Sequence, residues 1–519
     1  MFHHNAHLFG RSGINRLMFT TAIVLLLAFV AVSINAQDDG ESVLRVGMLE
    51  PIQLDPAIGT NDPEILLNRS IYDYLIETLP DNTVGPNLAT NWEISDDGLS
   101  YTFTLRDDVT FHDGSQLTAA DVAYTYNRLK ELESPALGLL GEFEVEAADD
   151  YTVLFTLAQP NADFIFGVAS RHAAILKDGA ENVNVIEGEN FANFNGTGPF
   201  IVEQYSPGEL AVLRANDNYW ADGQPGVDRL EFIFIDDTLT QVNALRDGAV
   251  DFIFKIAVDQ IEQIEAQDNL YVLEASTNQH PLIRLRADAG HIGEDPRIRE
   301  AFKLATDRDE LLEVVQLNAG VIGNNDPIGP AYGAFYDSSI QQPDYDPERA
   351  CELIQEATGQ ERLSSDFYVV DAFNYEELGT RLQQQWAEGC IDVELLVRAE
   401  GIYYGDDEWL TVDLGITGWG DRPVPQGYLN EAYLPDAPFA ETHWVDDELV
   451  TLIEDAAVTA DPDARAEIYS QIQQIFADRG PVIIPWFATL FGAASERVEG
   501  LTLHPFAGQT DLRTVTVSE

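Results

Sequence analysis

The segment 87–129, NLATNWEISDDGLSYTFTLRDDVTFHDGSQLTAADVAYTYNRL, constrains the fold of this chain more than any other stretch. Its apolar residues at 101, 103 and 105 alternate with polar ones, which is the period of a half-buried strand. An Asp-Gly pair stands on either side of that strand, and such pairs favour turns. Thr118 lies three residues before Asp121, a spacing typical of a helix N-cap. The segment therefore predicts strands, turns and a helix, and it offers no nucleophile beside a base.

The same two periodicities recur along the chain. Alternating apolar residues predict strands over 43–49, 151–157, 200–205, 209–215, 229–235 and 250–254, and helical spacing predicts helices over 64–79 and 239–246. From about residue 281 we expect helices at 298–307, 310–317, 347–358, 376–388, 446–458 and 463–478, and strands at 366–370, 391–397, 414–418 and 481–487. Such alternation is typical of α/β architecture, and 519 residues suffice for two or three lobes.

The chain is strongly acidic, with 28 basic and 89 acidic residues and a formal charge of −61. This charge argues against nucleic acid or an anionic membrane as a partner. It has two interpretations: a solvated surface fitted to salty or acidic surroundings, or steering of cationic ligands toward a cleft. The acids are spread along the chain, so we favour the solvated surface.

The N-terminus has the pattern of an export signal. Residues 17–34 are almost wholly apolar, they follow Arg11 and Arg16, and polar sequence begins at Gln37. This predicts a Sec-type signal peptide, residues 1–36, cleaved after Ala36. An uncleaved membrane anchor is the alternative, because the apolar run is long. Either way we expect an extracytoplasmic protein.

Both cysteines, Cys351 and Cys390, follow the export signal. An oxidising compartment permits one disulfide between them. Cys351 lies in a predicted helix and Cys390 at the end of another, and helix ends in one layer are often neighbours. Two free buried thiols are the alternative. Zinc is not expected, because no paired histidine spacing accompanies the cysteines.

Eight short motifs along the chain resemble, in order, landmarks of the extracytoplasmic solute-binding proteins of ABC importers, specifically the peptide/nickel-type family 5. They are 54–56 (LDP), 196–200 (GTGPF), 218–220 (NYW), 244–251 (ALRDGAVD), 295–302 (DPRIREAF), 305–308 (ATDR), 345–350 (YDPERA) and 418–421 (GWGD). The segment 87–129 belongs to the same series. The likeness spans almost the whole chain after the export signal.

The resemblance implies an α/β, periplasmic-binding-protein-like fold of type II, cluster C. It has two α/β lobes, an extra third domain and a ligand cleft between lobes that close by a hinge. We expect lobe I to comprise 37–79, 195–280 and 481–519, lobe II (the extra domain) 80–194, and lobe III 281–480. The segment 87–129 would then lie away from the cleft.

The resemblance also implies where ligand binds. Trp419 follows Gly418 at a strand end, suited to stacking against a ligand; a buried core tryptophan is the alternative. Asp421 is similar to an aspartate that pairs with a peptide's α-ammonium in relatives, although family members often carry one more residue before it and then an acidic-Pro pair. Asp421 is therefore a ligand residue or a surface-turn aspartate, and Arg422 would otherwise face a ligand carboxylate.

Across the cleft we expect Thr60 and Asn61, whose backbone would pair with an extended peptide like an added strand. Tyr403 and Tyr404 are weaker cleft candidates. For Arg284, near the crossover into lobe III, we expect a hinge ion pair.

The leading functional hypothesis is capture of a peptide or peptide-like solute and delivery to an ABC permease complex, by a monomer without catalysis, cofactor, metal or nucleic acid. The same fold carrying nickel, haem, an opine or a sugar is the first alternative. A secreted acidic hydrolase with paired carboxylates is the remote one. No G-x-S-x-G or H-E-x-x-H motif supports an enzyme.

Overall fold

The computed structural model describes residues 40–183, 191–372, 374–405 and 408–518. The expected signal peptide or anchor at 1–36 lies outside the described residues. Within the described ranges, no helix is both long enough and apolar enough to cross a bilayer.

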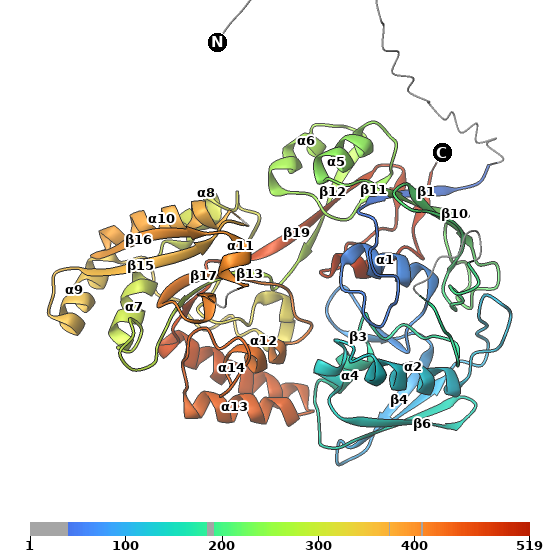
Figure 1. The fold of residues 1–519 in the computed structure, drawn as a ribbon, viewed down its shortest axis with the longest axis horizontal. Coiled ribbons are helices and arrows are strands. Elements are labelled where there is room, and N and C mark those ends of the chain that lie inside the picture. Colours follow the sequence, from blue (N-terminus) through green and yellow to red (C-terminus); the bar gives the residue numbers. More distant parts are fainter. Residues whose placement is uncertain (1–39, 184–190, 373, 406–407, 519) are drawn as a thin grey trace, which may run out of the picture. The chain divides into compact units, whose positions relative to one another are not determined.

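The largest sheet is built around the first strand, β1 (Figure 1). Its order is β12-β19-β11-β1-β10-β9-β8, and β14 adds to β19. β1 runs parallel to both of its neighbours, and its Leu44, Val46 and Met48 side chains are fully buried. The strands are β1 Val43–Met48, β8 Phe200–Ser206, β9 Leu210–Ala215, β10 Arg229–Phe234, β11 Phe252–Ile253, β12 Leu270–Ser276, β14 Gly320–Ile322 and β19 Trp486–Ser495.

Short elements accompany this sheet. Its helices are α1 Asp62–Ile71, α5 Thr238–Arg246, α6 Ile261–Glu265, η1 Val258–Gln260 and η4 Ala507–Gln509. Two separate two-stranded sheets are also present: β2 Ile76–Thr78 with β3 Val84–Pro86, and β20 Val498–Glu499 with β21 Thr516–Val517.

The segment 87–129 supplies β4, β5 and α2 of a second unit, whose antiparallel sheet has the order β4-β5-β7-β6. As predicted, alternate residues of β5 are buried, and Thr118 and Asp121 form a capping box at the start of α2. α2 packs on β6 and β7, and together they enclose a separate hydrophobic core. The elements are β4 Ala89–Ile94, β5 Ser100–Leu105, β6 Phe143–Asp149, β7 Thr152–Leu157, α2 Ala119–Glu131, α3 Leu137–Leu140 and α4 Phe164–Val168.

The third sheet has the order β16-β15-β17-β13-β18 and is flanked by the longer helices. Its strands are β13 His280–Leu285, β15 Leu363–Val370, β16 Ile391–Arg398, β17 Leu414–Trp419 and β18 Val482–Ile483. Its helices are α7 Pro296–Leu304, α8 Arg308–Val314, α9 Pro347–Thr358, α10 Tyr375–Glu388, α11 Glu400–Tyr403, α12 Pro425–Ala432, α13 Asp447–Val458 and α14 Pro462–Arg479, with η2 Pro330–Phe335 and η3 Glu408–Leu410.

Two short connections run between the first and third sheets, in addition to the longer segments on either side of β14. The chain crosses from β12 to β13 through residues 277–279, and it returns from β18 to β19. The crossings are bonded to each other, because Thr277 Oγ1 donates to the carbonyl of Ala488 at 2.6 Å and the Ala488 amide donates to Gln279 at 2.8 Å. A pair of short crossings is the geometry that a hinge requires.

The helix predicted over 64–79 is wrong in its second half, because α1 ends at Ile71. The segment 196–198 lies directly against that end. The amide of Gly198 donates to the Ile71 carbonyl at 2.9 Å, and a Cβ on Gly196 would lie 2.0 Å from the same oxygen. Asp73, just beyond, accepts hydrogen bonds from Thr197, Tyr219 and Trp220. These contacts with residues far along the chain end the helix at Ile71, although the local spacing of apolar residues would allow it to continue.

Cys351 on α9 and Cys390 at the start of β16 form a disulfide with a Cα–Cα distance of 4.9 Å. We predict that the unfolded, unreduced protein shows no reactive thiol and that reduction releases both. Thiol titration in denaturant measures this directly. Two reactive thiols before reduction would show that the bridge is absent from the isolated protein.

Candidate ligand-binding cavity

A cavity of about 840 Å³ lies where segments of the three sheets meet. Its walls come from the loops around α3 and α4, from α12 with the residues before it, from the end of α13, and from Phe506 and Gln509. Both apolar and ionisable side chains line it, the composition expected of a small-solute site. Two predicted site residues, Asp421 and Arg422, belong to this lining.

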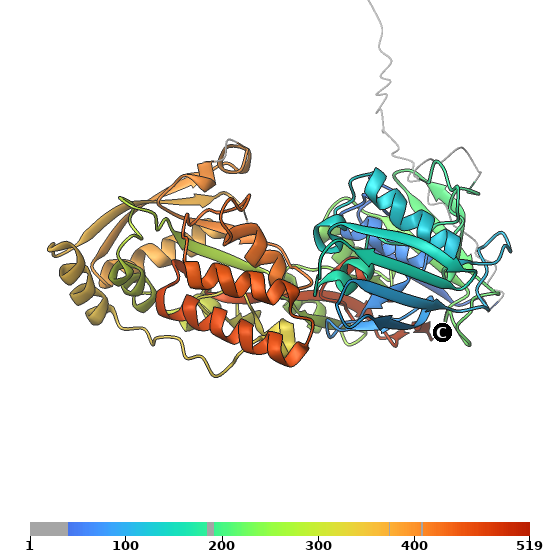
Figure 2. The ribbon, with the colours of Figure 1, turned by 90° about the horizontal axis from the view of Figure 1, so that it is seen from below.

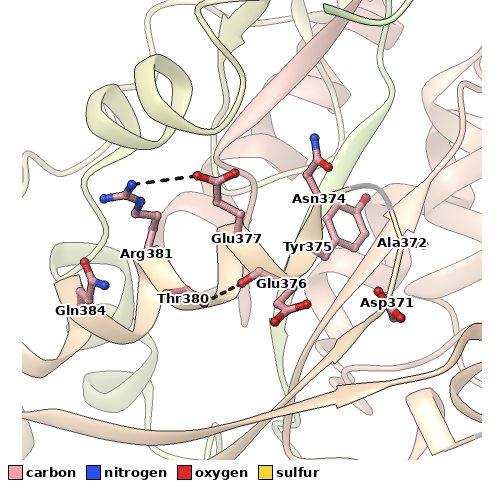
Figure 3. A pocket seen from close by; sticks show the side chains of 9 residues that line it. All are labelled: Asp371, Ala372, Asn374, Tyr375, Glu376, Glu377, Thr380, Arg381 and Gln384. Carbon is pink, nitrogen blue, oxygen red and sulfur yellow. Dashed lines mark hydrogen bonds and ion pairs between the residues drawn. The ribbon is translucent and has the colours of Figure 1, made fainter. Parts of the chain in front are cut away.

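A second, more open hollow of about 620 Å³ lies along α10. Figure 3 shows its side chains: Glu377 faces Arg381 at 4.0 Å, and the Thr380 hydroxyl donates to the backbone of Glu376. None of the predicted site residues lines it. We therefore build the site on the larger cavity.

Asp421 follows the end of β17 and is half-buried. Burial raises the pKa of its carboxyl to about 7. Hydrogen bonds from the backbone of Asn278 and Arg422 oppose this rise, as do the positive charges of Arg422 and Arg171. Asn278 belongs to the 277–279 crossing, so the carboxyl group is anchored beside the connection between sheets.

Arg422 is already paired. Its Nη2 atom donates to Glu431 Oε2 at 2.8 Å, and the guanidinium lies 5.7 Å from the ring centres of both Trp419 and Tyr428. The Arg422 guanidinium is therefore held in place by Glu431, Trp419 and Tyr428 and is not free to pair with a ligand. The expectation that Arg422 binds a ligand carboxylate therefore finds little support in this geometry.

Arg171 is a cavity residue that the sequence argument missed. It is half-buried, and its side chain has no hydrogen bond or ion pair with any part of the chain that the structure describes. Burial and the charge of Arg422 lower its pKa, while Asp62 and Asp421 oppose that shift. A guanidinium in this state is suited to bind an anionic group.

His172 lies beside Arg171 and is 5% exposed. Burial, together with the adjacent Arg171 charge, lowers its pKa to about 4. The imidazole is therefore neutral at pH 7 and contributes no charge to the cavity.

Trp419 lies in the core rather than in the cavity wall. It is 8% exposed, packs against Tyr428, and donates from Nε1 to Glu441 Oε1 at 2.9 Å. Glu441 also accepts from Thr417 and forms a buried ion pair with Arg284 at 2.8 Å. Arg284 was expected to form a hinge ion pair, but its pair with Glu441 is buried within the core around the third sheet and does not span the crossing. The surroundings of Trp419 agree with the alternative of a core tryptophan.

The two tyrosines also lie outside the cavity lining. Tyr403 is fully buried, and its hydroxyl contacts Arg284 at 3.5 Å. Tyr404 is half-buried, and its hydroxyl accepts from the Gly418 amide at 3.4 Å. Both side chains support the end of β17.

Thr60 and Asn61 are exposed, and neither lines the cavity. Their backbone amides donate to Glu64 Oε2 at 2.8 and 3.0 Å. Glu64 caps the N-terminus of α1 in this way. The amides of Thr60 and Asn61 are therefore already bonded and cannot pair with an added peptide strand.

The family model of bacterial extracellular solute-binding proteins, family 5 Middle, matches residues 83–438. The chain belongs to this family. It is 26% identical over 515 residues to the dipeptide-binding protein of Escherichia coli strain K12, covering 92% of this chain and 95% of that protein. It is 26% identical over 473 residues to heme-binding protein A of Haemophilus influenzae, covering 85% of each. The solved structure of HbpA2 from Haemophilus parasuis matches with a TM-score of 0.81 at 25% identity, over 92% of this chain and 100% of that one.

These findings confirm the expected family and the mixed α/β architecture of the cluster C periplasmic binding proteins. The protein is a solute-binding protein of an ABC importer, and its homologues are extracytoplasmic. The family binds solutes without transforming them, so the hydrolase alternative is set aside.

Proposed function

We propose that this protein captures a short peptide or peptide-like solute with both charged termini free, and delivers it to a membrane permease. In this proposal the protein has three lobes: lobe I (37–79, 195–280 and 481–519), lobe II (80–194) and lobe III (281–480). The 840 Å³ cavity is its binding site, and closure takes place about the paired crossings between lobes I and III.

The observation that supports a peptide is the charge pair in the cavity. Asp421 and Arg171 line the same space, and each alters the pKa of the other. A peptide carries an α-ammonium and an α-carboxylate at opposite ends, so it can satisfy both groups at once. Arg171, rather than Arg422, is the carboxylate partner, because Glu431 already pairs with Arg422.

Thermal-shift screening tests the ligand class. Alanine peptides of two to six residues are expected to raise the unfolding temperature, since a ligand that binds only the folded state stabilises it. N-acetylated and C-amidated peptides remove one terminal charge each and should lose most of the effect. Nickel, haem, opines and sugars form the comparison arms. Stabilisation by one of these classes with none by any peptide would overturn the peptide assignment.

A further inference from the structure

A buried ion pair joins lobe II to lobe III beside the cavity. Asp163 lies immediately before α4, and Arg465 lies in the first turn of α14. Arg465 Nη2 donates to Asp163 Oδ2 at 2.8 Å, and Arg465 Nη1 lies 2.7 Å from Asp163 Oδ1. The two side chains are 4% and 5% exposed. Figures 1 and 2 both show the red-orange helices α13 and α14 beside the teal α4 segment.

Two further hydrogen bonds cross the same boundary. The amide of Ala162 donates to the carbonyl of Ala457 at the end of α13, at 2.9 Å. The side-chain amide of Asn82 donates to the carbonyl of Pro423 at 2.8 Å. Few polar contacts therefore hold this boundary, and the ion pair is the only charged one among the described residues of lobes II and III.

The boundary between lobes II and I is of a different kind. Arg128 on α2 pairs with Asp55, and Ser134 donates to the Ala57 carbonyl at 2.6 Å. His112 in the turn after β5 contacts the Gly198 carbonyl at 3.0 Å. These contacts come from three separate segments of lobe II, namely α2, the residues after it and the turn after β5. Lobe II is therefore joined to lobe I by several contacts, and the ion pair is the charged contact that would have to break, with the two hydrogen bonds, if lobe III moved away.

The pair is connected to the cavity wall. Asp163 itself lines the cavity. The Arg465 guanidinium lies 5.2 Å from the ring of Tyr469, and the Tyr469 hydroxyl donates to Gln426 Oε1 at 3.3 Å. Gln426 on α12 is another cavity residue. Displacement of α12 or α4 would therefore disturb the ion pair.

We propose that Asp163 and Arg465 form a latch that holds lobe II against lobe III when the cavity is closed and releases when it opens. This inference rests on the proposed function in one respect, namely that lobes separate to admit solute. In the open form both charges would be hydrated, so an intact pair adds little net free energy and permits reversible opening. Removing one partner leaves an uncompensated buried charge in the closed form alone, and this favours opening.

Hydrogen exchange of the ligand-free exported chain tests the latch. In Asp163→Asn and Arg465→Met, the amide of Ala162 and the peptide 454–461 are expected to exchange at least about tenfold faster than in the unaltered protein. Arg465→Lys, which keeps the charge, should recover part of the protection. The matched control is Arg349→Met, which removes an exposed arginine from lobe III and its ion pair with Glu352.

Two results would overturn the latch. Unchanged exchange at both segments would show that the pair does not hold the lobes together. Faster exchange throughout β5, β7 and α2 would show that the pair stabilises the fold of lobe II instead. No ligand is used, so a failed peptide screen leaves this test intact.

Discussion

Replacing Asp421 with asparagine is expected to weaken binding of dialanine about 30-fold at pH 7.5. The variant keeps the shape of the side chain and removes the charge that we propose pairs with the peptide ammonium. A hydrogen bond to a charged group contributes about 2 kcal/mol, which corresponds to roughly a 30-fold change in Kd. Isothermal titration calorimetry measures the difference. The control is Asp344→Asn, an exposed aspartate of lobe III outside the cavity, for which we expect no change.

The pH dependence sharpens this prediction. The pKa of Asp421 is raised to about 7, so its carboxyl takes up a proton as pH falls from 7.5 to 5 and loses its attraction for the ammonium. Affinity of the unaltered protein should fall over this window toward that of Asp421→Asn, whose affinity should stay nearly constant. A flat profile for the unaltered protein would remove Asp421 from the ammonium site.

The raised pKa of Asp421 also affects folding stability, but in the opposite direction: stability falls as pH rises. The folded-state pKa exceeds the unfolded value of 3.8, so the folded protein binds more protons between these two values. The contribution of Asp421 to stability is present below pH 3.8 and is lost as pH rises through 7. Asp421→Asn should therefore unfold at a higher temperature than the unaltered protein at pH 7.5, although it binds more weakly. Weaker binding together with a higher unfolding temperature would show that Asp421 acts in binding and not in stabilising the fold.

Local sequence patterns predicted the elements well where one face of a strand or helix is buried. The alternation in β5 and the Thr118–Asp121 capping box depend only on neighbours within a few residues. The end of α1 was not predictable in this way. It is set by Gly196 and Gly198, which lie more than a hundred residues further along the chain.

The site was predicted only in part for the same reason. Asp421 could be found from a motif, but Trp419 could not be placed, because its orientation depends on Glu441, a partner 22 residues away. Arg171 follows a short helix with no periodic signal, and only the cavity shows that it has no hydrogen-bond or ion-pair partner among the described residues. The sequence offers no signal for it, because most arginines of this chain have no acidic residue beside them.

Replacing Glu441 with alanine is expected to cause the largest loss of stability, about 3 kcal/mol. Glu441 is 1% exposed and Arg284 is fully buried, so the variant leaves the guanidinium charge without a counterion in the core. Breaking a buried pair on one side costs about 3–5 kcal/mol. We take the lower end because Arg284 also donates to the carbonyls of Trp409 and Val412. The indole of Trp419 loses its acceptor as well.

Urea unfolding followed by tryptophan fluorescence measures the loss. The control is Glu448→Ala, which removes a 67% exposed partner of Arg479 and should change the free energy of unfolding by less than about 0.5 kcal/mol. The double variant Glu441→Leu with Arg284→Met removes both buried charges and should recover most of the lost stability. If the double variant is as unstable as Glu441→Ala, the loss of stability comes from altered packing around Trp419 and not from the unpaired charge of Arg284.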